Sequence, residues 1–178
     1  MKRNLFFIVL IFIILCGCGY TAGSLLPSGE SSLHVDNFVN KIDITTEVSE
    51  KKVYYAYGPG METDITREVI DKFIVDGNYE LKGIKAANFL LKGQLIDFRR
   101  EPLRYDANDN VVEYRLSVVV DIELHDLKEG KIVWREKNFA GESTYRTTGQ
   151  FAKSESVAMT AAISDLARRI VERTVENW

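Results

Sequence analysis

The sequence predicts an α+β domain of two layers, in which two helices pack on one face of a small mixed, mainly antiparallel sheet. Residues 89–145 alternate between apolar and polar side chains, as strands with one buried face do, and turn residues interrupt them twice. Two segments with helical spacing of apolar residues, 63–76 and 154–178, flank these strands. Helices on one face of an antiparallel sheet bury all of these apolar stripes.

Residues 1–17 have the features of a bacterial lipoprotein signal peptide. The start is basic, and residues 5–15 form an unbroken apolar run. A helix of that length reaches only ~17 Å, against roughly 30 Å for the hydrocarbon core, so the run is too short to span a membrane. Leu15 and Gly17 before Cys18 resemble the site of the lipoprotein signal peptidase. We therefore expect Cys18 to be the acylated first residue of the mature chain.

Cys16 is a poorer lipidation site because the bulky Leu15 precedes it directly. Cleavage before Cys18 removes Cys16, so the mature chain is expected to have one cysteine and no disulfide, and its fold depends on packing alone. The alternative is an ordinary secreted protein whose cysteines happen to follow the apolar run.

Charge and length limit the possible classes of protein. Removal of residues 1–17 takes away two of the 23 basic residues and none of the 26 acidic ones, which leaves a net charge of −5. A nucleic-acid-binding protein would carry a basic surplus, so that class is not expected. Residues 18–32 are rich in Gly and Ser and predict a flexible tether. Residues 33–178 have the length of a single domain with an ordinary core.

Local patterns predict the first strand and the first helix. Residues 33–39 alternate as a short strand, with His34 on its polar phase. Thr63 or Asp64 is predicted to cap the helix, and Gly77 to end it. The apolar positions of this helix are Ile65, Val69, Ile70, Phe73 and Ile74.

The next elements are predicted to be a three-stranded antiparallel meander, residues 89–105, 111–127 and 132–145, and a second helix. The first strand has apolar residues on both phases, which predicts that much of both of its faces is buried under other parts of the chain. Gly93 within it indicates a bulge or the close approach of another backbone. The final helix is predicted to begin at Ser154 and Glu155. Its apolar positions are Val157, Ala158, Ala161, Leu166, Ala167, Ile170, Val171 and Val175.

No sequence pattern indicates catalysis or a metal site. The chain has two histidines, His34 and His125, and lacks Gly-x-Ser-x-Gly, His-Glu-x-x-His and Walker motifs. Asp121 and Glu123 share one strand face, as a general acid and base would, but any exposed strand face gives the same pattern. We expect a binding or structural protein that is not an enzyme and has no cofactor and no metal.

Four short segments carry a family resemblance: Cys18-Gly19-Tyr20, Ala86-Ala87-Asn88-Phe89-Leu90-Leu91, Glu113-Tyr114-Arg115 and Phe151-Ala152-Lys153-Ser154-Glu155. Together they resemble the LptE family, the lipopolysaccharide-assembly lipoproteins. The resemblance implies the same fold and a lipid anchor in the outer membrane. It also implies a plug and assembly partner of the LptD β-barrel, which contacts lipopolysaccharide during its insertion into the outer leaflet. The domain would lie on the periplasmic side or inside the barrel lumen.

The resemblance further implies contacts with lipopolysaccharide phosphates, which Arg and Lys bind through charge-assisted hydrogen bonds. Lys153 matches a family position implicated in lipopolysaccharide contact. The other candidates are Arg99, Arg100, Arg104 and Arg146. For each residue the alternative is a solvated charge at the rim of the sheet.

Two other functions are compatible with the sequence. The first is a periplasm-facing lipoprotein that binds cell-wall or envelope components as a scaffold and has no barrel partner. The second is a ligand-carrying lipoprotein, which would need an apolar cavity. Co-purification distinguishes the first from a plug, because a plug must travel with a large barrel protein.

Overall fold

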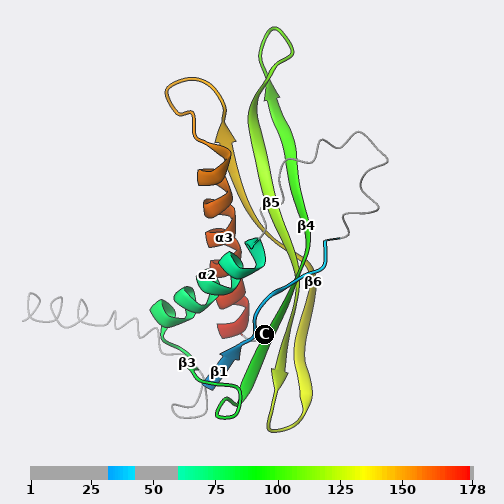
Figure 1. The fold of residues 1–178 in the computed structure, drawn as a ribbon, viewed down its shortest axis with the longest axis vertical. Helices are drawn as coiled ribbons and strands as arrows, with labels where there is room; N and C mark the ends of the chain where they lie inside the picture. The colour runs from blue at the N-terminus through cyan, green and yellow to red at the C-terminus, as the bar shows by residue number, and fades with distance from the viewer. Residues whose placement is uncertain (1–31, 43–59, 177–178) are drawn as a thin grey trace, which may run out of the picture.

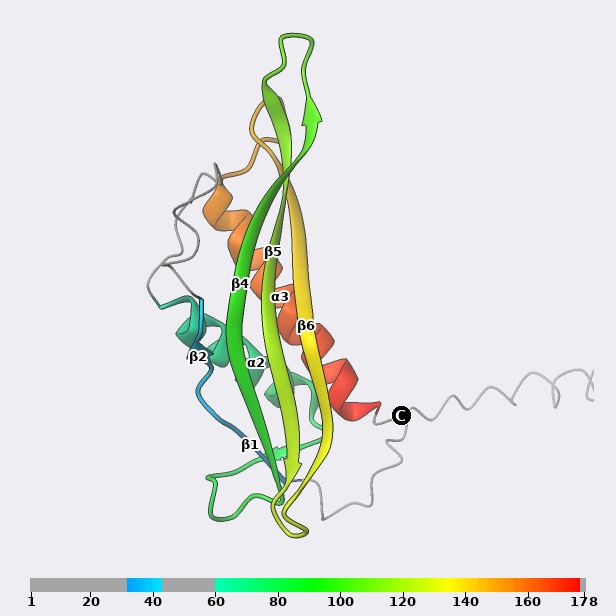
Figure 2. The same cartoon turned by 90° about the vertical axis from the view of Figure 1, so that its right-hand side faces the viewer.

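The computed structural model describes residues 32–42 and 60–176 as a long twisted sheet with two helices on one face (Figure 1). Figure 2 shows β4, β5 and β6 in front of both helices. The two-layer α+β fold predicted from the sequence is confirmed. The elements are β1 (Ser32–Val35), β2 (Val39–Asn40), α2 (Met61–Asp76), β3 (Glu80–Leu81), β4 (Phe89–Tyr105), β5 (Val111–Asp126), β6 (Lys131–Arg146) and α3 (Glu155–Val175).

Several predictions fall on residues outside the described ranges. The signal peptide, the lipidation site Cys18 and nearly all of the tether belong to residues 1–31. The described chain begins within β1 at Ser32, the residue assigned to the end of the tether. The division into signal peptide, tether and one domain stays a prediction.

The sheet is six-stranded and mixed, with the strand order β3-β1-β4-β5-β6 and with β2 also paired to β4. β4, β5 and β6 form the predicted antiparallel meander, whereas β1 and β2 run parallel to β4. The prediction of a single strand over residues 33–39 is wrong, because this segment forms the two strands β1 and β2. The two strands are separated at Phe38, whose side chain is buried in the core and whose N–H donates to Thr66 Oγ1 at 2.9 Å.

A register shift in β4 explains its apolar residues on both phases. Leu95 pairs with Val120 and Phe98 with Val118, so one extra residue, Ile96, lies between them in β4. Such a bulge reverses the faces of all later residues. Leu91 therefore packs in the helix-covered core before the bulge and Phe98 against that core after it. The apolar residues on both phases thus follow from this bulge, not from the predicted cover of both faces.

Gly93 is required by a side chain, not by the predicted bulge or neighbouring backbone. A Cβ atom at this position would lie 2.0 Å from Cε1 of Phe38, whose ring packs on the strand. The bulge itself lies between Leu95 and Asp97.

The first turn of α2 differs from the prediction. The helix begins at Met61 after Gly60, which has a φ of 101° and provides no side-chain cap. Thr63 and Asp64 lie inside the first turn and donate their N–H groups to the Gly60 carbonyl. The predicted end at Gly77 is confirmed, with a φ of 74°.

The buried face of α2 is narrower than predicted. Ile65, Val69 and Phe73 are fully buried at i, i+4 and i+8, whereas Ile74 is 64% exposed. One residue step turns a helix by about 100°, so the residue after Phe73 points away from the core.

The predicted cap of α3 is confirmed, because Ser154 Oγ accepts the N–H of Val157 at 3.4 Å. Two of its predicted core positions are wrong: Val157 is 53% exposed, and Ala161 is also exposed. The helix packs on the sheet along a row of residues four positions apart that begins at Ala158. Val157 and Ala161 each precede a member of this row by one position, so they face solvent. The buried residues are Ala158, Ala162, Ile163, Leu166, Ala167, Ile170, Val171 and Thr174.

α3 makes a backbone contact with β6 at Gly141. A Cβ atom there would lie 2.4 Å from the backbone nitrogen of Leu166 and 2.5 Å from the carbonyl oxygen of Ala162. Only glycine leaves room for this approach, which brings α3 against the edge of the sheet.

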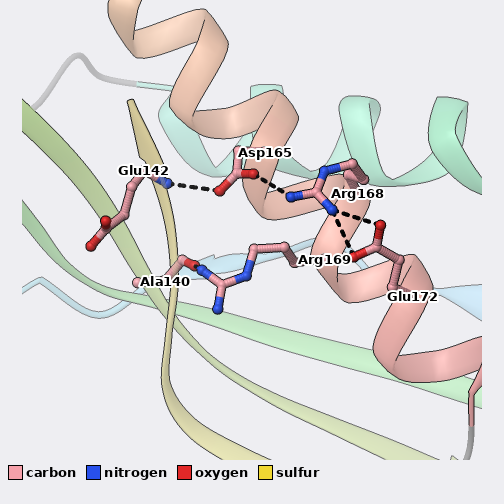
Figure 3. A network of polar contacts seen from close by, with 6 residues as sticks. All are labelled: Ala140, Glu142, Asp165, Arg168, Arg169 and Glu172. Atoms are coloured by element: carbon pink, nitrogen blue, oxygen red, sulfur yellow. Dashed lines mark hydrogen bonds and ion pairs between the residues drawn. The ribbon is translucent and has the colours of Figure 1, made fainter. Parts of the chain in front are cut away.

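The same approach closes part of the sheet edge (Figure 3). β6 is an edge strand, and Asp165 Oδ2 accepts the Glu142 N–H at 3.0 Å while Arg169 donates to the Ala140 carbonyl. Arg168 bonds Asp165 and thereby holds it in place. Side chains of α3 thus occupy two backbone groups that could otherwise pair with a foreign strand, which is one way that proteins protect sheet edges.

We expect Gly141→Ala to lower the free energy of unfolding by roughly 2 kcal/mol or more, because the added methyl must push the α3 backbone away from β6. Urea unfolding of the purified chain measures the loss. Gly83→Ala is the matched control, since a Cβ at Gly83 meets nothing within 4 Å. An equal effect of both substitutions would contradict the close-approach argument.

We expect Asp165→Asn to destabilise the chain at neutral pH, by roughly 1 kcal/mol for one weakened charged hydrogen bond. Burial raises the pKa of Asp165, but hydrogen bonds from Glu142 and Arg168, with the charges of Arg168 and Arg169, lower the pKa below its usual value overall.

Since its folded-state pKa is depressed, Asp165 contributes stability above its unfolded pKa and loses that contribution as the pH falls through the folded pKa. The difference between wild type and Asp165→Asn should therefore shrink from about pH 7 to about pH 3. Urea titrations at both pH values check this, and a constant difference would oppose it.

Candidate functional site

The predicted basic residues gather at one end of the sheet, where the β4–β5 hairpin extends past the start of α3 (Figures 1 and 2). We call this the tip end. It consists of residues 98–115, residues 143–146 of β6, and residues 147–157, which lead into α3.

Two arginines share one carboxylate on the outer face of the tip end, the face away from the helices. Glu113 of β5 lies in register with Arg104 of β4 and Arg146 of β6. Its Oε2 is 3.5 Å from Arg104 Nε and 3.8 Å from Arg146 Nε. The arginine side chains are 61% and 46% exposed, and that of Glu113 is 19% exposed. One carboxylate between two guanidinium groups leaves an accessible net positive charge.

Arg100 lies on the other face of the sheet, beside the start of α3. Its Nη1 is 3.4 Å from Glu155 Oε2, and its guanidinium lies 3.8 Å from the ring centroid of Tyr114. Tyr145 stacks on Tyr114 and donates its hydroxyl hydrogen to Glu155 at 2.9 Å. Burial, this hydrogen bond and the Glu155 charge raise the pKa of Tyr145 to about 12. This half-buried cluster fastens β4 and β6 to the start of α3.

The remaining two candidates occupy separate positions. Arg99 faces away from the helices and forms an ion pair with Asp97 at 2.9 Å. Lys153 is exposed, and its backbone N–H donates to the Arg146 carbonyl at 2.9 Å. The structure therefore brings Lys153 near the pair of Arg104 and Arg146. Arg99 and Arg100 are consecutive residues of β4, so they lie on opposite faces of the sheet.

Sequence reasoning missed Glu113 as the shared partner of two arginines, because only strand register shows which charges meet. It also missed the apolar side chains exposed at the tip end. They are Leu103, Tyr105, Phe151 and Val157. The tip end therefore has exposed apolar side chains at the same end of the sheet as the two arginines that share Glu113.

The outer face of β5 was predicted to be polar, and its charged side chains are paired. Arg115 lies 3.8 Å from Glu142, and Glu123 contacts Arg135 and also His125 at 2.9 Å. Burial raises the pKa of Glu123, but its hydrogen bonds with Arg135 and His125 lower it below the usual value overall.

Ser117 departs from the predicted solvated face, because it is 4% exposed and points toward Glu142. Asp121 accepts the Asn138 N–H at 2.9 Å. Asp121 and Glu123, considered above as an acid and base pair, thus each hold a structural contact.

Among residues 32–42 and 60–176, no three His, Cys, Asp or Glu side chains converge as a metal site would require. His34 Nδ1 lies 2.9 Å from the Lys82 carbonyl oxygen, which is a hydrogen-bond distance to the backbone of the segment after β3. None of the helices in this part of the chain has the length and hydropathy to cross a membrane.

A sheet with two helices on one face and an extended hairpin defines a class of small α+β domains that is also found in solved structures. A protein from Xanthomonas campestris has a TM-score of 0.58 at 12% identity, over 87% of this chain and 90% of that chain. A hypothetical protein from Chlamydia trachomatis has a TM-score of 0.55 at 10% identity, over 83% and 97%. These likenesses show the fold alone.

The rare lipoprotein B from Shewanella oneidensis is also similar, with a TM-score of 0.47 and 18% identity over 82% of this chain and 92% of that chain. A search of curated proteins finds no significant match. The model of the LptE family, described as lipopolysaccharide-assembly, matches residues 34–176. The chain therefore belongs to the LptE family, whose members are non-enzymatic, outer-membrane-associated lipoproteins, and its role is in lipopolysaccharide assembly.

Proposed function

We propose that this protein is the lipoprotein component of the outer-membrane lipopolysaccharide translocon. Acylated at Cys18, it acts as plug and assembly partner of an LptD-like β-barrel and contacts lipopolysaccharide during insertion into the outer leaflet. The family match over residues 34–176 supports the assembly role. The arrangement of Arg104 and Arg146 around Glu113 supports the lipid contact.

The tip end has the chemistry that a phosphorylated lipid requires. Both arginine side chains are largely exposed and their ion pairs with Glu113 are 3.5 and 3.8 Å long, so these pairs contribute little stability and a phosphate can compete with Glu113 for the two guanidinium groups. Guanidinium groups bind phosphate oxygens through pairs of charged hydrogen bonds. The exposed Leu103, Tyr105 and Phe151 lie at the same end and offer apolar contact to acyl chains.

Among the basic residues, we propose Arg104, Arg146 and Lys153 as the principal lipopolysaccharide contacts. Arg99 and Arg100 are secondary candidates, because each has a nearby carboxylate that it does not share with a second arginine of this group, and Arg100 is mostly covered.

The outer face of the sheet supports the plug role. A barrel interior is polar, so a plug needs a polar surface without strong net charge. Away from Arg104 and Arg146, ion pairs such as Arg115 with Glu142 and Arg135 with Glu123 balance the charges of this face. The scaffold without a barrel partner is the competing proposal, and the same face could serve it.

We expect the double substitution Arg104→Gln and Arg146→Gln to weaken binding of purified lipoprotein to lipopolysaccharide roughly tenfold or more, because two charged hydrogen-bond donors are lost. Binding of a labelled lipopolysaccharide in detergent measures this. The matched control, Arg115→Gln with Arg135→Gln, also removes two arginines from the outer face but away from the shared carboxylate. Equal losses in both variants would mean that general charge, not the pair of Arg104 and Arg146 around Glu113, governs binding.

We expect a tagged full-length lipoprotein, solubilised from its native envelope in mild detergent, to recover an LptD-like barrel in stoichiometric amount. Depletion of the lipoprotein should lower the level of assembled barrel, because a plug that assists assembly is needed before the barrel is complete. Mass spectrometry and heat-modifiability gels measure both effects. Recovery of the lipoprotein alone, with barrel levels unchanged, would favour the envelope scaffold instead.

A further inference from the structure

The end of the sheet opposite the tip end exposes three aliphatic side chains. Ile84 is 49% exposed in the segment before β4, and Leu127 and Ile132 of the β5–β6 hairpin are 38% and 43% exposed. The two segments meet where the Leu127 N–H donates to the Asn88 carbonyl at 2.7 Å. Both lie at the end of the sheet away from the β4–β5 turn (Figures 1 and 2). We call this surface, residues 82–88 and 126–132, the base end.

Lysines lie next to the aliphatic residues of the base end in the sequence. Lys82, Lys85, Lys128 and Lys131 belong to these two segments. Aliphatic side chains beside lysines are typical of surfaces that rest on lipid headgroups, because lysine stems lie along apolar surface while their ammonium groups stay at the charged layer.

The positive charge of the base end is largely balanced. Lys82 lies 2.8 Å from Glu80, and Lys131 is paired with Glu129. Asp126 accepts the backbone N–H groups of the hairpin turn. Apolar contact rather than net charge must therefore supply most of any affinity of this surface for lipid.

The chain enters the domain at the base end. Ser32, where the described domain begins, accepts the Asn88 N–H at its carbonyl at 3.0 Å, and its hydroxyl lies 3.5 Å from the Ala86 carbonyl. The segment from Cys18 to Ser32 spans at most roughly 50 Å when fully extended. An acyl anchor on Cys18 would keep the base end close to the membrane but would not orient the domain.

We propose that the base end is a lipid-docking surface. In the lipoprotein before it enters a barrel, Ile84, Leu127 and Ile132 rest in the headgroup layer of the membrane that holds the Cys18 anchor. The long axis of the sheet then stands away from that membrane, with the tip end accessible to periplasmic partners. This inference rests on the acylation of Cys18, which is part of the proposed function.

Site-specific quenching tests the orientation. The two cysteines of the sequence are Cys16 and Cys18, so after processing and acylation a single introduced cysteine can be labelled selectively. Full-length lipoprotein with a fluorophore at Lys128→Cys or at Asp109→Cys is reconstituted into phosphatidylethanolamine and phosphatidylglycerol vesicles that contain a nitroxide-labelled lipid. We expect severalfold stronger quenching at position 128 than at position 109. High salt should change this little, because the contact is mainly apolar.

The triple substitution Ile84→Ser, Leu127→Ser and Ile132→Ser should lower quenching at position 128 to the level at position 109, while the protein stays vesicle-bound through its anchor. These side chains are exposed, and circular dichroism checks that the variant is folded; Ile84→Ser alone should give part of the loss. The control, Leu103→Ser with Val157→Ser, removes exposed aliphatic residues from the tip end and should leave the quenching at position 128 unchanged.

Three results would overturn the proposal. Equal quenching at both positions means that the domain lies flat, and no quenching at position 128 in vesicle-bound protein means that it stands clear of the lipid. Disulfide-linked dimers through unlabelled Lys128→Cys would assign the base end to a second copy of the chain. Failure of the protein to float with vesicles is a different result, since it contradicts acylation of Cys18 and so the proposed function itself.

Discussion

The approach of α3 to β6 at Gly141 is the contact on which the helix side of the sheet depends. Since no Cβ intervenes, the helix backbone reaches the sheet edge, and Asp165 and Arg169 can bind the outward groups of β6. The same contact sets the direction of the α3 axis along the sheet. As a result, Glu155 at the start of α3 lies beside Arg100 and Tyr145. One glycine thus links closure of the edge to the geometry of the tip end.

The bulge at Ile96 decides which arginines are available at the tip end. With this extra residue, Arg100 turns toward α3 and is held by Glu155, while Arg99 turns to the outer face beside Asp97. Without it, the two side chains would exchange faces, because a shift of one residue reverses every later position. The charge pattern of the hairpin therefore depends on a backbone irregularity far from the charges themselves.

Local signals in the sequence predicted the fold class, the meander, the end of α2 and the start of α3 well, since alternation, Gly77 and Ser154 act on neighbouring residues. Non-local contacts were not predictable in the same way. Gly93 is required by the ring of Phe38, a partner 55 positions away in the chain, and Val157 faces solvent because packing on the sheet sets the rotation of α3. The candidate site shows the same limit, since only register reveals that Glu113 lies between Arg104 and Arg146.

Net charge is a poor guide to the tip end for the same reason. The mature chain is expected to be acidic, yet the exposed row of Arg104, Glu113 and Arg146 is positive. A phosphate that binds both arginines must displace the Glu113 carboxylate. Its affinity therefore depends on how much more strongly the two guanidinium groups bind the phosphate than the carboxylate. A dianionic phosphate gains more from two guanidinium groups than a single carboxylate does, and this difference favours a multiply charged lipid over the internal partner.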